Sequence, residues 1–285
     1  MQPRFLHVWA HMMAIDTGRY VVAVAVGVLV FWVWGRERFR SRRIARRPPA
    51  ASSVRRELRY SASTAVIFSL VGVTLFYGTR AGVFHMYPHW SDRGVLYFTF
   101  TLVLLPLLHD TYFYWTHRAM HHPKIFRVVH DVHHQSNNPS PCAAYAFHPL
   151  EAIVQAAFVP LIASAIPLSE VALFLFLTFM ILRNVLGHLG IEPFPRWFVK
   201  NQWTLLSTTA THHAMHHSRF HSNYGLYLTF WDRVMKTTHA DYEATFEAIT
   251  SRARSTRVER KVDADHDADH DGDRPDEKAL TLASR

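Results

Sequence analysis

The sequence is nearly without thiols: its 285 residues contain one cysteine, Cys142. A single cysteine excludes an intrachain disulfide and a thiolate cluster for a metal. No H-E-x-x-H segment is present, which disfavours a zinc protease. No C-x-x-C-H haem attachment occurs, and no glutamate stands three residues before a histidine, as in the carboxylate di-iron sites of helical bundles. A metal site in this chain must therefore use other ligands.

Charge is missing from long stretches of the chain. Three runs carry no formal charge and a fourth carries only Glu170: Tyr20–Gly35, Tyr60–Thr79, Gly94–Leu108 and Ala152–Leu182. A bilayer-spanning helix needs about 20 apolar residues, with about 17 tolerated. The second run is long enough by itself. The first and third are long enough with flanking aromatic and basic residues at the interfaces, and the fourth can form two short helices. We predict an all-α, multi-pass membrane helical bundle; the alternative is a set of buried helices in a large soluble core.

The positive charge is concentrated between the first two runs. Ten arginines lie there: Arg36, Arg38, Arg40, Arg42, Arg43, Arg46, Arg47, Arg55, Arg56 and Arg59. The positive-inside rule places this loop in the cytosol, so the third helix returns to the cytosolic side and the fourth run enters the membrane partway and comes back. Nucleic-acid binding is the other explanation of a net charge of +9. We expect no nucleic-acid partner, because apolar helices flank the arginines and anionic lipids attract them.

Histidines are abundant between His109 and His221, where 14 of the 21 in the chain fall. Eight of them form three sets: His117 and His121; His130, His133 and His134; His213, His216 and His217. Residues three and four apart share one face of a helix, so each set can aim imidazoles at one point. Neutral imidazole suits iron, zinc, copper and nickel. Because a closed structural zinc site needs four ligands, eight histidines favour a site with more than one ion, in a helical cap on the cytosolic membrane surface.

The same residues resemble a known family. The run His109-Asp110-Thr-Tyr-Phe-Tyr-Trp-Thr-His117-Arg-Ala-Met-His121 is similar to the first histidine box of the fatty acid hydroxylase/sterol desaturase superfamily. His130-x-x-His133-His134 resembles the second box and His213-x-x-His216-His217 the third. The segments Phe147–Glu151, Asn223–Gly225 and Trp231–Arg233 resemble the family as well. The resemblance implies an integral-membrane oxidoreductase with two iron ions, which uses O2 to hydroxylate or desaturate a C–H bond of a fatty acyl or sterol-like lipid.

The resemblance also implies a ligand set. It comprises nine histidines: His117, His121, His130, His133, His134, His188, His213, His216 and His217. Asn184 stands where some members have a further histidine, one helical turn before His188. His122 and His212 lie about 100° around a helix from neighbouring ligands, so we expect outer or surface positions for them. His109, His148 and His221 have no assigned role. Asp110, Asp131, Asn184 and Asp232 are candidates to orient a ligand imidazole, with Asp110 ranked above Asp131.

Two alternative functions and one partner follow from these residues. A zinc-dependent membrane lipid hydrolase would use the same histidines without a reductant, and a non-catalytic metal-binding membrane protein would use them without lipid turnover. An oxygenase needs two electrons per turnover, and no haem or flavin motif is visible. We therefore expect an external electron donor, a ferredoxin- or cytochrome-type reductant. The predicted organisation is 1–93, transmembrane helices with the Arg-rich loop; 94–240, the catalytic domain; and 241–285, a charged, disordered tail.

Overall fold

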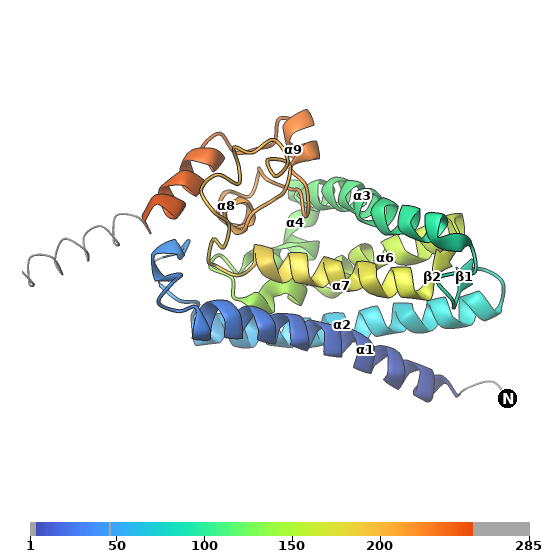
Figure 1. Cartoon of the computed structure of the whole chain (residues 1–285). Helices are drawn as coiled ribbons and strands as arrows, with labels where there is room; N and C mark the ends of the chain where they lie inside the picture. The colour runs from blue at the N-terminus through green and yellow to red at the C-terminus, as the bar shows by residue number, and fades with distance from the viewer. Residues whose placement is uncertain (1–3, 46, 253–285) are drawn as a thin grey trace, which may run out of the picture.

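A computed structural model describes residues 4–45 and 47–252, and the chain is mostly helical over these residues. Five long helices lie side by side: α1 (Phe5–Gly27), α2 (Ala51–Arg80), α3 (Gly94–Met120), α6 (Pro149–Ala165) and α7 (Glu170–Gly187) (Figure 1). The π-helical segment η1 (Val28–Trp34) extends α1 toward the end of the bundle that carries α4 (Pro123–Val129), α8 (Ala210–Arg219) and α9 (Phe230–Val234). The all-α prediction is confirmed.

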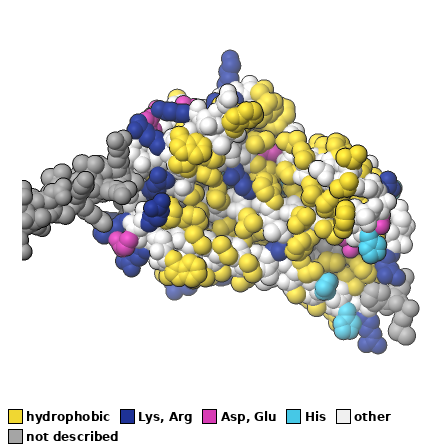
Figure 2. All heavy atoms as spheres, viewed as in Figure 1, with side chains coloured by type: hydrophobic (Ala, Val, Ile, Leu, Met, Phe, Trp, Pro, Cys, Tyr) yellow, Lys and Arg dark blue, Asp and Glu magenta, His cyan; other side chains and the backbone are white. Residues whose placement is uncertain are grey.

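Within the described residues, four helical stretches are long and apolar enough to cross a membrane: Phe5–Trp34, Ala51–Arg80, Gly94–Met120 and Glu170–Gly187. Their outer faces are hydrophobic; on α3, Leu96 is 84% exposed and Val103 is 58% exposed. Exposed aliphatic side chains at this density are costly in water and favourable in lipid. The chain is an integral membrane protein, as the sequence predicts, and hydrophobic side chains cover the middle of the bundle in Figure 2.

The first helix begins earlier than the charge-free run Tyr20–Gly35 indicates. It begins at Phe5 and contains Asp16 and Arg19 within its length. The two side chains are three residues apart and form an ion pair, with Arg19 Nη2 2.9 Å from Asp16 Oδ1. Because the pair neutralises itself on one face of the helix, two formal charges do not end the apolar segment.

The fourth apolar run forms a hairpin of α6 and α7, which Ile166 and Pro167 separate. At the tip of the hairpin, β2 (Leu168–Ser169) pairs in parallel with β1 (Met86–Tyr87), in the connection between α2 and α3. His85 adds a further link, since its N–H donates to the Ala163 carbonyl at 2.9 Å. The hairpin therefore reaches the same level as the α2–α3 connection, rather than only partway into the bundle.

The core lies between the long helices. Tyr20 and Ala23 of α1 pack against Ile181 and Val185 of α7, and Tyr145 stacks on Tyr20 with ring centroids 4.9 Å apart. A second apolar cluster joins α3, α6 and α7. This packing holds the ends of the long helices in place relative to one another.

The cap is a set of short elements at one end of the bundle: η2 (Arg40–Arg42), α4 (Pro123–Val129), α5 (Asp131–His134), η3 (Pro141–Tyr145), α8 (Ala210–Arg219) and α9 (Phe230–Val234). Residues 242–252, which the sequence analysis assigns to a disordered tail, form a helix whose Tyr242 and Phe246 are buried. Apolar residues at i and i+4 explain this packing, because they lie on one helical face. The remainder of the predicted tail, 253–285, lies outside the described residues.

Candidate metal centre

All nine histidines of the predicted ligand set lie in the cap or at the ends of the long helices that meet it, and each is buried. They form two groups, within each of which one nitrogen per ring lies within 4.8 Å of every other. The five-histidine group is His117, His121, His130, His134 and His216; the four-histidine group is His133, His188, His213 and His217. The groups adjoin, since the His134 and His217 rings are 4.8 Å apart. Their function as ligands remains a prediction, to which we return below.

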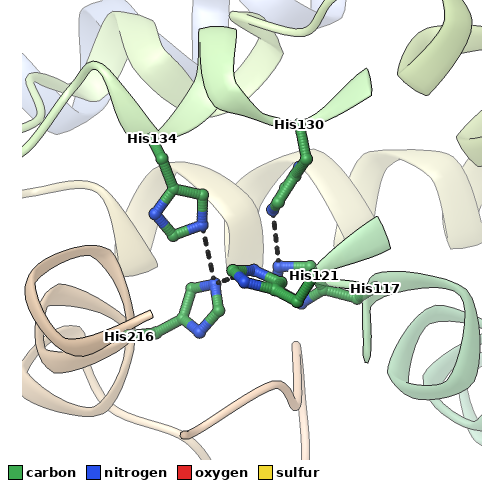
Figure 3. Close-up of side chains that lie close together, drawn as sticks. All are labelled: His117, His121, His130, His134 and His216. Atoms are coloured by element: carbon green, nitrogen blue, oxygen red, sulfur yellow. Dashed lines mark hydrogen bonds between the residues drawn. The ribbon is translucent and has the colours of Figure 1, made fainter. Parts of the chain in front are cut away.

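The five-histidine group collects side chains from three parts of the chain. His117 and His121 come from the last turns of α3, His130 and His134 flank α5, and His216 comes from α8 (Figure 3). Their Nε2 atoms point inward: 3.0 Å separates those of His117 and His130, and 3.2 Å separates those of His121 and His216. Residues four apart on α3 therefore converge with residues about 100 positions later.

The four-histidine group is built in the same way. His213 and His217 are one turn apart on α8, and His188 follows the last residue of α7. His188 Nε2 lies 3.0 Å from His213 Nε2 and 3.4 Å from His133 Nε2. His188, which follows the membrane hairpin, is therefore the one member of the four-histidine group that does not belong to the three histidine boxes.

The outward nitrogens of several rings meet oxygen acceptors. Nδ1 of His117 lies 2.8 Å from the Tyr224 carbonyl, and Nδ1 of His216 lies 2.7 Å from the Ser222 carbonyl. Nδ1 of His188 lies 2.8 Å from the Asn184 carbonyl. A carbonyl oxygen only accepts, so each Nδ1 carries the proton and each Nε2 presents a lone pair to its group. Asn184 thus orients His188 through its backbone, while its side-chain amide donates to the Ala144 carbonyl at 2.7 Å.

A carboxylate completes this arrangement. Glu151, at the first turn of α6, places Oε1 2.8 Å from His130 Nδ1, and both side chains are 1% exposed. A carboxylate behind a metal-binding imidazole fixes its orientation and raises its basicity. From the sequence, this function is predicted for Asp110 ahead of Asp131, with Asn184 and Asp232 as further candidates, and not for Glu151. Asp110 accepts from the N–H groups of Tyr227 and Leu228, and Asp131 accepts from the Gln135 side chain.

Burial keeps the rings neutral. It lowers the pKa of His188 to about 4 and holds the pKa values of His130, His133 and His213 well below the ordinary 6.5. The neighbouring histidines lower the pKa values of His130, His133 and His213 further, because protonated rings would repel one another. Neutral imidazole is the form that binds metals.

The inward lone pairs test whether a cation fits. With the protons of His117 and His216 on Nδ1, both Nε2 atoms present lone pairs to the five-histidine group, whose ligand nitrogens lie within 4.8 Å of one another. Buried acceptors this close to one another repel, whereas a cation among them removes the repulsion. The donor set is all imidazole, with a carboxylate and carbonyls behind it, and it fits ions such as iron or zinc.

The loop that carries Tyr224 is held by two aspartates. Asp232 of α9 accepts from the N–H groups of Tyr224 and Gly225 at 2.9 and 2.8 Å. Asp110 of α3 accepts from Tyr227 N at 2.8 Å. Asp232 also faces His212 Nε2 at 3.4 Å, so His212 and Asp232 act on the loop behind His117 rather than within a group.

The other histidines have separate functions. Nδ1 of His122 and Nδ1 of His148 accept from the N–H groups of Lys124 and Leu150, each at 3.3 Å, and thereby begin α4 and α6. His109 Nδ1 lies 2.9 Å from the Tyr227 hydroxyl. His221 is exposed and follows the end of α8. None of these four joins either group.

Another buried carboxylate, which the sequence analysis missed, begins α8. Glu192 Oε2 accepts from the Thr211 N–H and hydroxyl at 2.8 and 2.7 Å. An acidic side chain at a helix N-terminus is stabilising because of the helix dipole. The residue before a proline in an irregular segment carries little sequence signal for such a contact.

An apolar cavity of about 730 Å³ lies within the bundle, and neighbours of the histidine groups form part of its lining. Its lining includes Phe113, Phe147, Asn184 and Leu226. Phe113 contacts the His117 ring at 4.9 Å between centroids, and Phe147 contacts the His133 ring at 5.2 Å. The volume falls in the usual range for a small-molecule site, and part of the cavity wall lies beside the histidines.

Comparison with known proteins shows the relationship. Residues 102–237 match the fatty acid hydroxylase family, and this range includes all nine histidines of the two groups. The segment 102–237 of the chain therefore carries the features of the fatty acid hydroxylase family. The histidine-box resemblance in the sequence is confirmed by this match.

Curated proteins similar to this chain include a sterol desaturase and a lathosterol oxidase. The chain is 28% identical to the Delta(7)-sterol 5(6)-desaturase of Aspergillus fumigatus over 64% of this chain and 61% of the relative. It is 26% identical to the lathosterol oxidase of Homo sapiens over 64% of this chain and 60% of the relative. The chain therefore spans about 60% of the length of these relatives. No solved structure matches.

Proposed function

We propose that this protein is an O2-dependent, di-iron membrane oxidoreductase that hydroxylates or desaturates a C–H bond of a fatty acyl or sterol-like lipid. The observation that carries the proposal is the pair of adjoining histidine groups beside the apolar cavity. The family match and the sterol-modifying relatives support a lipid oxidoreductase. The two groups supply donors for two ions, one in each group.

The protein residues would divide the work between holding ions and placing the lipid. The nine histidines would hold the iron, with Glu151 and the carbonyls of Tyr224, Ser222 and Asn184 fixing ring orientation. Bound iron supplies the activation of O2. Hydroxylation consumes one lipid C–H bond, O2, two electrons and two protons and gives an alcohol and water. Desaturation removes two hydrogens from adjacent carbons with the same co-substrates and gives an alkene and two waters.

The electrons require a donor outside the reaction pocket. We propose a ferredoxin- or cytochrome-type reductant that delivers them at the cap. We also propose that the cap is cytosolic, because the Arg-rich loop contacts it directly: the Arg42 guanidinium donates to the Phe194 carbonyl at 2.6 Å, and Ile44 N–H donates to the Gly190 carbonyl at 3.0 Å. Many Lys and Arg side chains gather at this end of the bundle (Figure 2), as the positive-inside rule requires of a cytosolic face. Residues 94–240 would form the catalytic domain.

The test is lipid mass spectrometry on cells that express the chain. We compare the wild type with His133→Ala, and use His89→Ala, an exposed histidine at the other end of the bundle, as the matched control. A lipid that gains one oxygen, or loses two hydrogens, in the wild type and the control but not in His133→Ala supports the proposal. No His133-dependent lipid, with reductant and iron supplied, refutes it.

Metal reconstitution separates the alternatives. The purified protein is stripped of metal and reloaded with iron or zinc, and the metal bound by His133→Ala is subtracted, because histidines and acids beyond residue 252 bind divalent ions in both proteins alike. Turnover with iron and reductant alone supports the oxygenase. Lipid hydrolysis with zinc and without reductant supports a hydrolase, and metal binding without turnover supports a non-catalytic protein.

A further inference from the structure

The wall of the cavity contains an ion pair within α1, one of the helices that can cross a membrane. Asp16 and Arg19 of α1 both line the cavity, and Arg19 Nη2 lies 2.9 Å from Asp16 Oδ1. Asp16 is 6% exposed. The Arg19 guanidinium also lies 5.7 Å from the centroid of the Phe174 ring, near the start of the membrane segment of α7. Ionisable side chains inside a membrane are costly and mark functional positions.

The ion pair leaves hydrogen-bonding capacity unused. Tyr145 donates its hydroxyl to Asp16 Oδ1 at 3.3 Å, whereas Asp16 Oδ2 and Arg19 Nε are buried without a partner among the described residues. An unpaired acceptor and an unpaired donor on neighbouring side chains are together the complement of one hydroxyl group, which both donates and accepts. If the ion pair served only to hold the helices together, we would expect Asp16 Oδ2 and Arg19 Nε to have hydrogen-bond partners in the protein.

A second polar group lines the same cavity from another helix. Gln155 of α6 is 9% exposed, and its amide forms no hydrogen bond within the described part of the chain. Its O and N atoms can again accept from and donate to a hydroxyl.

We propose that Asp16, Arg19 and Gln155 bind the hydroxyl group of a neutral lipid alcohol and so determine which of its carbons faces the histidines. The inference deepens the proposed function and rests on it. The charge of the site selects the head group: Asp16 and Arg19 together are neutral, so a hydroxyl adds no charge, whereas a carboxylate or phosphate would bring a second anion beside Asp16 into a low-dielectric wall. We call Asp16, Arg19 and Gln155 the hydroxyl anchor. Asp16 and Arg19 precede the matched family segment 102–237, so these two residues of the anchor lie outside that match.

The test measures binding rather than turnover, on the full-length protein purified in detergent. The probes are two scaffolds, lathosterol and hexadecan-1-ol, each also as its methyl ether, together with hexadecanoate. In the wild type, the alcohol of at least one scaffold should bind about 10-fold more tightly than its ether, since a hydrogen bond to a charged group is lost in the ether. Hexadecanoate should bind more weakly than hexadecan-1-ol.

Two variants locate the selectivity. Asp16→Asn/Arg19→Gln removes both charges together, which avoids an unpaired buried ion, and Gln155→Leu removes the amide with little change of volume. Each should reduce the alcohol-to-ether ratio while the iron content stays at the wild-type level. Thr74→Ala, at an exposed position of α2, should keep the ratio. Once oxidised product is identified, the double variant should also raise KM and spread oxidation over more carbons.

The outcomes separate this proposal from the proposed function. His133→Ala should lose lipid oxidation and keep the alcohol-to-ether ratio. Equal binding of alcohol and ether by the wild type overturns the anchor proposal. An unchanged alcohol-to-ether ratio in both anchor variants also overturns it, because a purely structural ion pair would affect stability and not this ratio. Alcohol-selective binding without any oxidised product would sustain the anchor and count against the oxygenase.

Discussion

Gly225 tests whether the loop behind His117 governs the metal centre. A Cβ atom added at Gly225 would lie 2.2 Å from the Leu228 carbonyl oxygen and 3.0 Å from Asp232 Oδ2. The first distance is about 1 Å inside an ordinary C···O contact, and its partner is backbone. The loop must therefore move in Gly225→Ala, and the hydrogen bonds from Tyr224 and Gly225 to Asp232 move with it.

The magnitude follows from these contacts. Forced overlap in a packed site costs about 1–3 kcal/mol, and loss of one hydrogen bond to a charged group costs about 1.5–3 kcal/mol. We expect Gly225→Ala to lower the free energy of unfolding by roughly 3–5 kcal/mol. Since the Tyr224 carbonyl accepts from His117 Nδ1, displacement of the loop should also weaken iron binding about 10- to 100-fold.

The assay combines thermal unfolding in detergent with anaerobic iron titration. Gly18→Ala is the matched control, because Gly18 lies in α1 with nothing within 4 Å of the added Cβ; alanine at this position should leave stability unchanged or raise it by about 0.5–1 kcal/mol. If Gly225→Ala matches the wild type in both melting temperature and iron affinity, the loop does not orient His117 as described.

Three further predictions concern the surroundings of the histidines. Glu151→Gln should lower iron affinity about 10- to 100-fold while the helical circular dichroism persists, because the amide holds His130 less firmly than the carboxylate; unchanged affinity would remove Glu151 from the centre. Removal of the metal with a chelator should lower the melting temperature, and reloading should restore it, because ions that bind only the folded state stabilise it; a melting temperature indifferent to chelation would contradict this. The metal-free protein should lose stability as the pH falls from 7 to 5: histidines of the unfolded chain take up protons near pH 6.5, whereas His188 in the fold has a pKa of about 4, so the unfolded state binds more protons and is favoured by acid. Unfolding by denaturant at each pH measures the slope, and a flat profile would show that the rings are not buried neutral.

Local spacing predicted much of the site. Residues three and four apart on a helix share a face, and this rule alone places His117 with His121 and His213 with His217, as the structure has them. The spacing rule does not predict which histidines of different helices lie together in space. The division into five and four arises from tertiary packing, because the adjacent residues His133 and His134 enter different groups, as do His216 and His217.

The acceptors behind the rings have no signature in the sequence. Every residue has a carbonyl, so nothing marks those of Tyr224 and Ser222 before the loop is folded. Glu151 carries a weak signal, as an acidic residue at the start of an apolar run, but its contact with His130 joins two elements 21 positions apart. Asp110 stands seven residues before His117, yet the packing of the 224–228 loop on α3 directs its carboxylate to backbone N–H groups instead.

The sequence predicts the helical class of the bundle well and the ends of its helices less well. Long apolar runs predict the membrane helices, whereas the start of α1 at Phe5 depends on the pairing of Asp16 with Arg19. The depth of the α6–α7 hairpin depends on the pairing of β2 with β1, and a contact between residues about 80 positions apart leaves no periodicity in either segment.

The order of the histidines along the chain bears on how the protein matures. Four members of the five-histidine group precede α6, and only His216 comes later, whereas the four-histidine group has His133 alone before the α6–α7 hairpin and needs both His213 and His217 of α8. During synthesis the first group therefore has most of its donors once the third membrane helix and α5 have emerged. The second group has half of its donors until α8 is made. Ion loading during biogenesis is thus expected to be sequential, and a nascent chain arrested before α8 would hold metal at one group and not at the other.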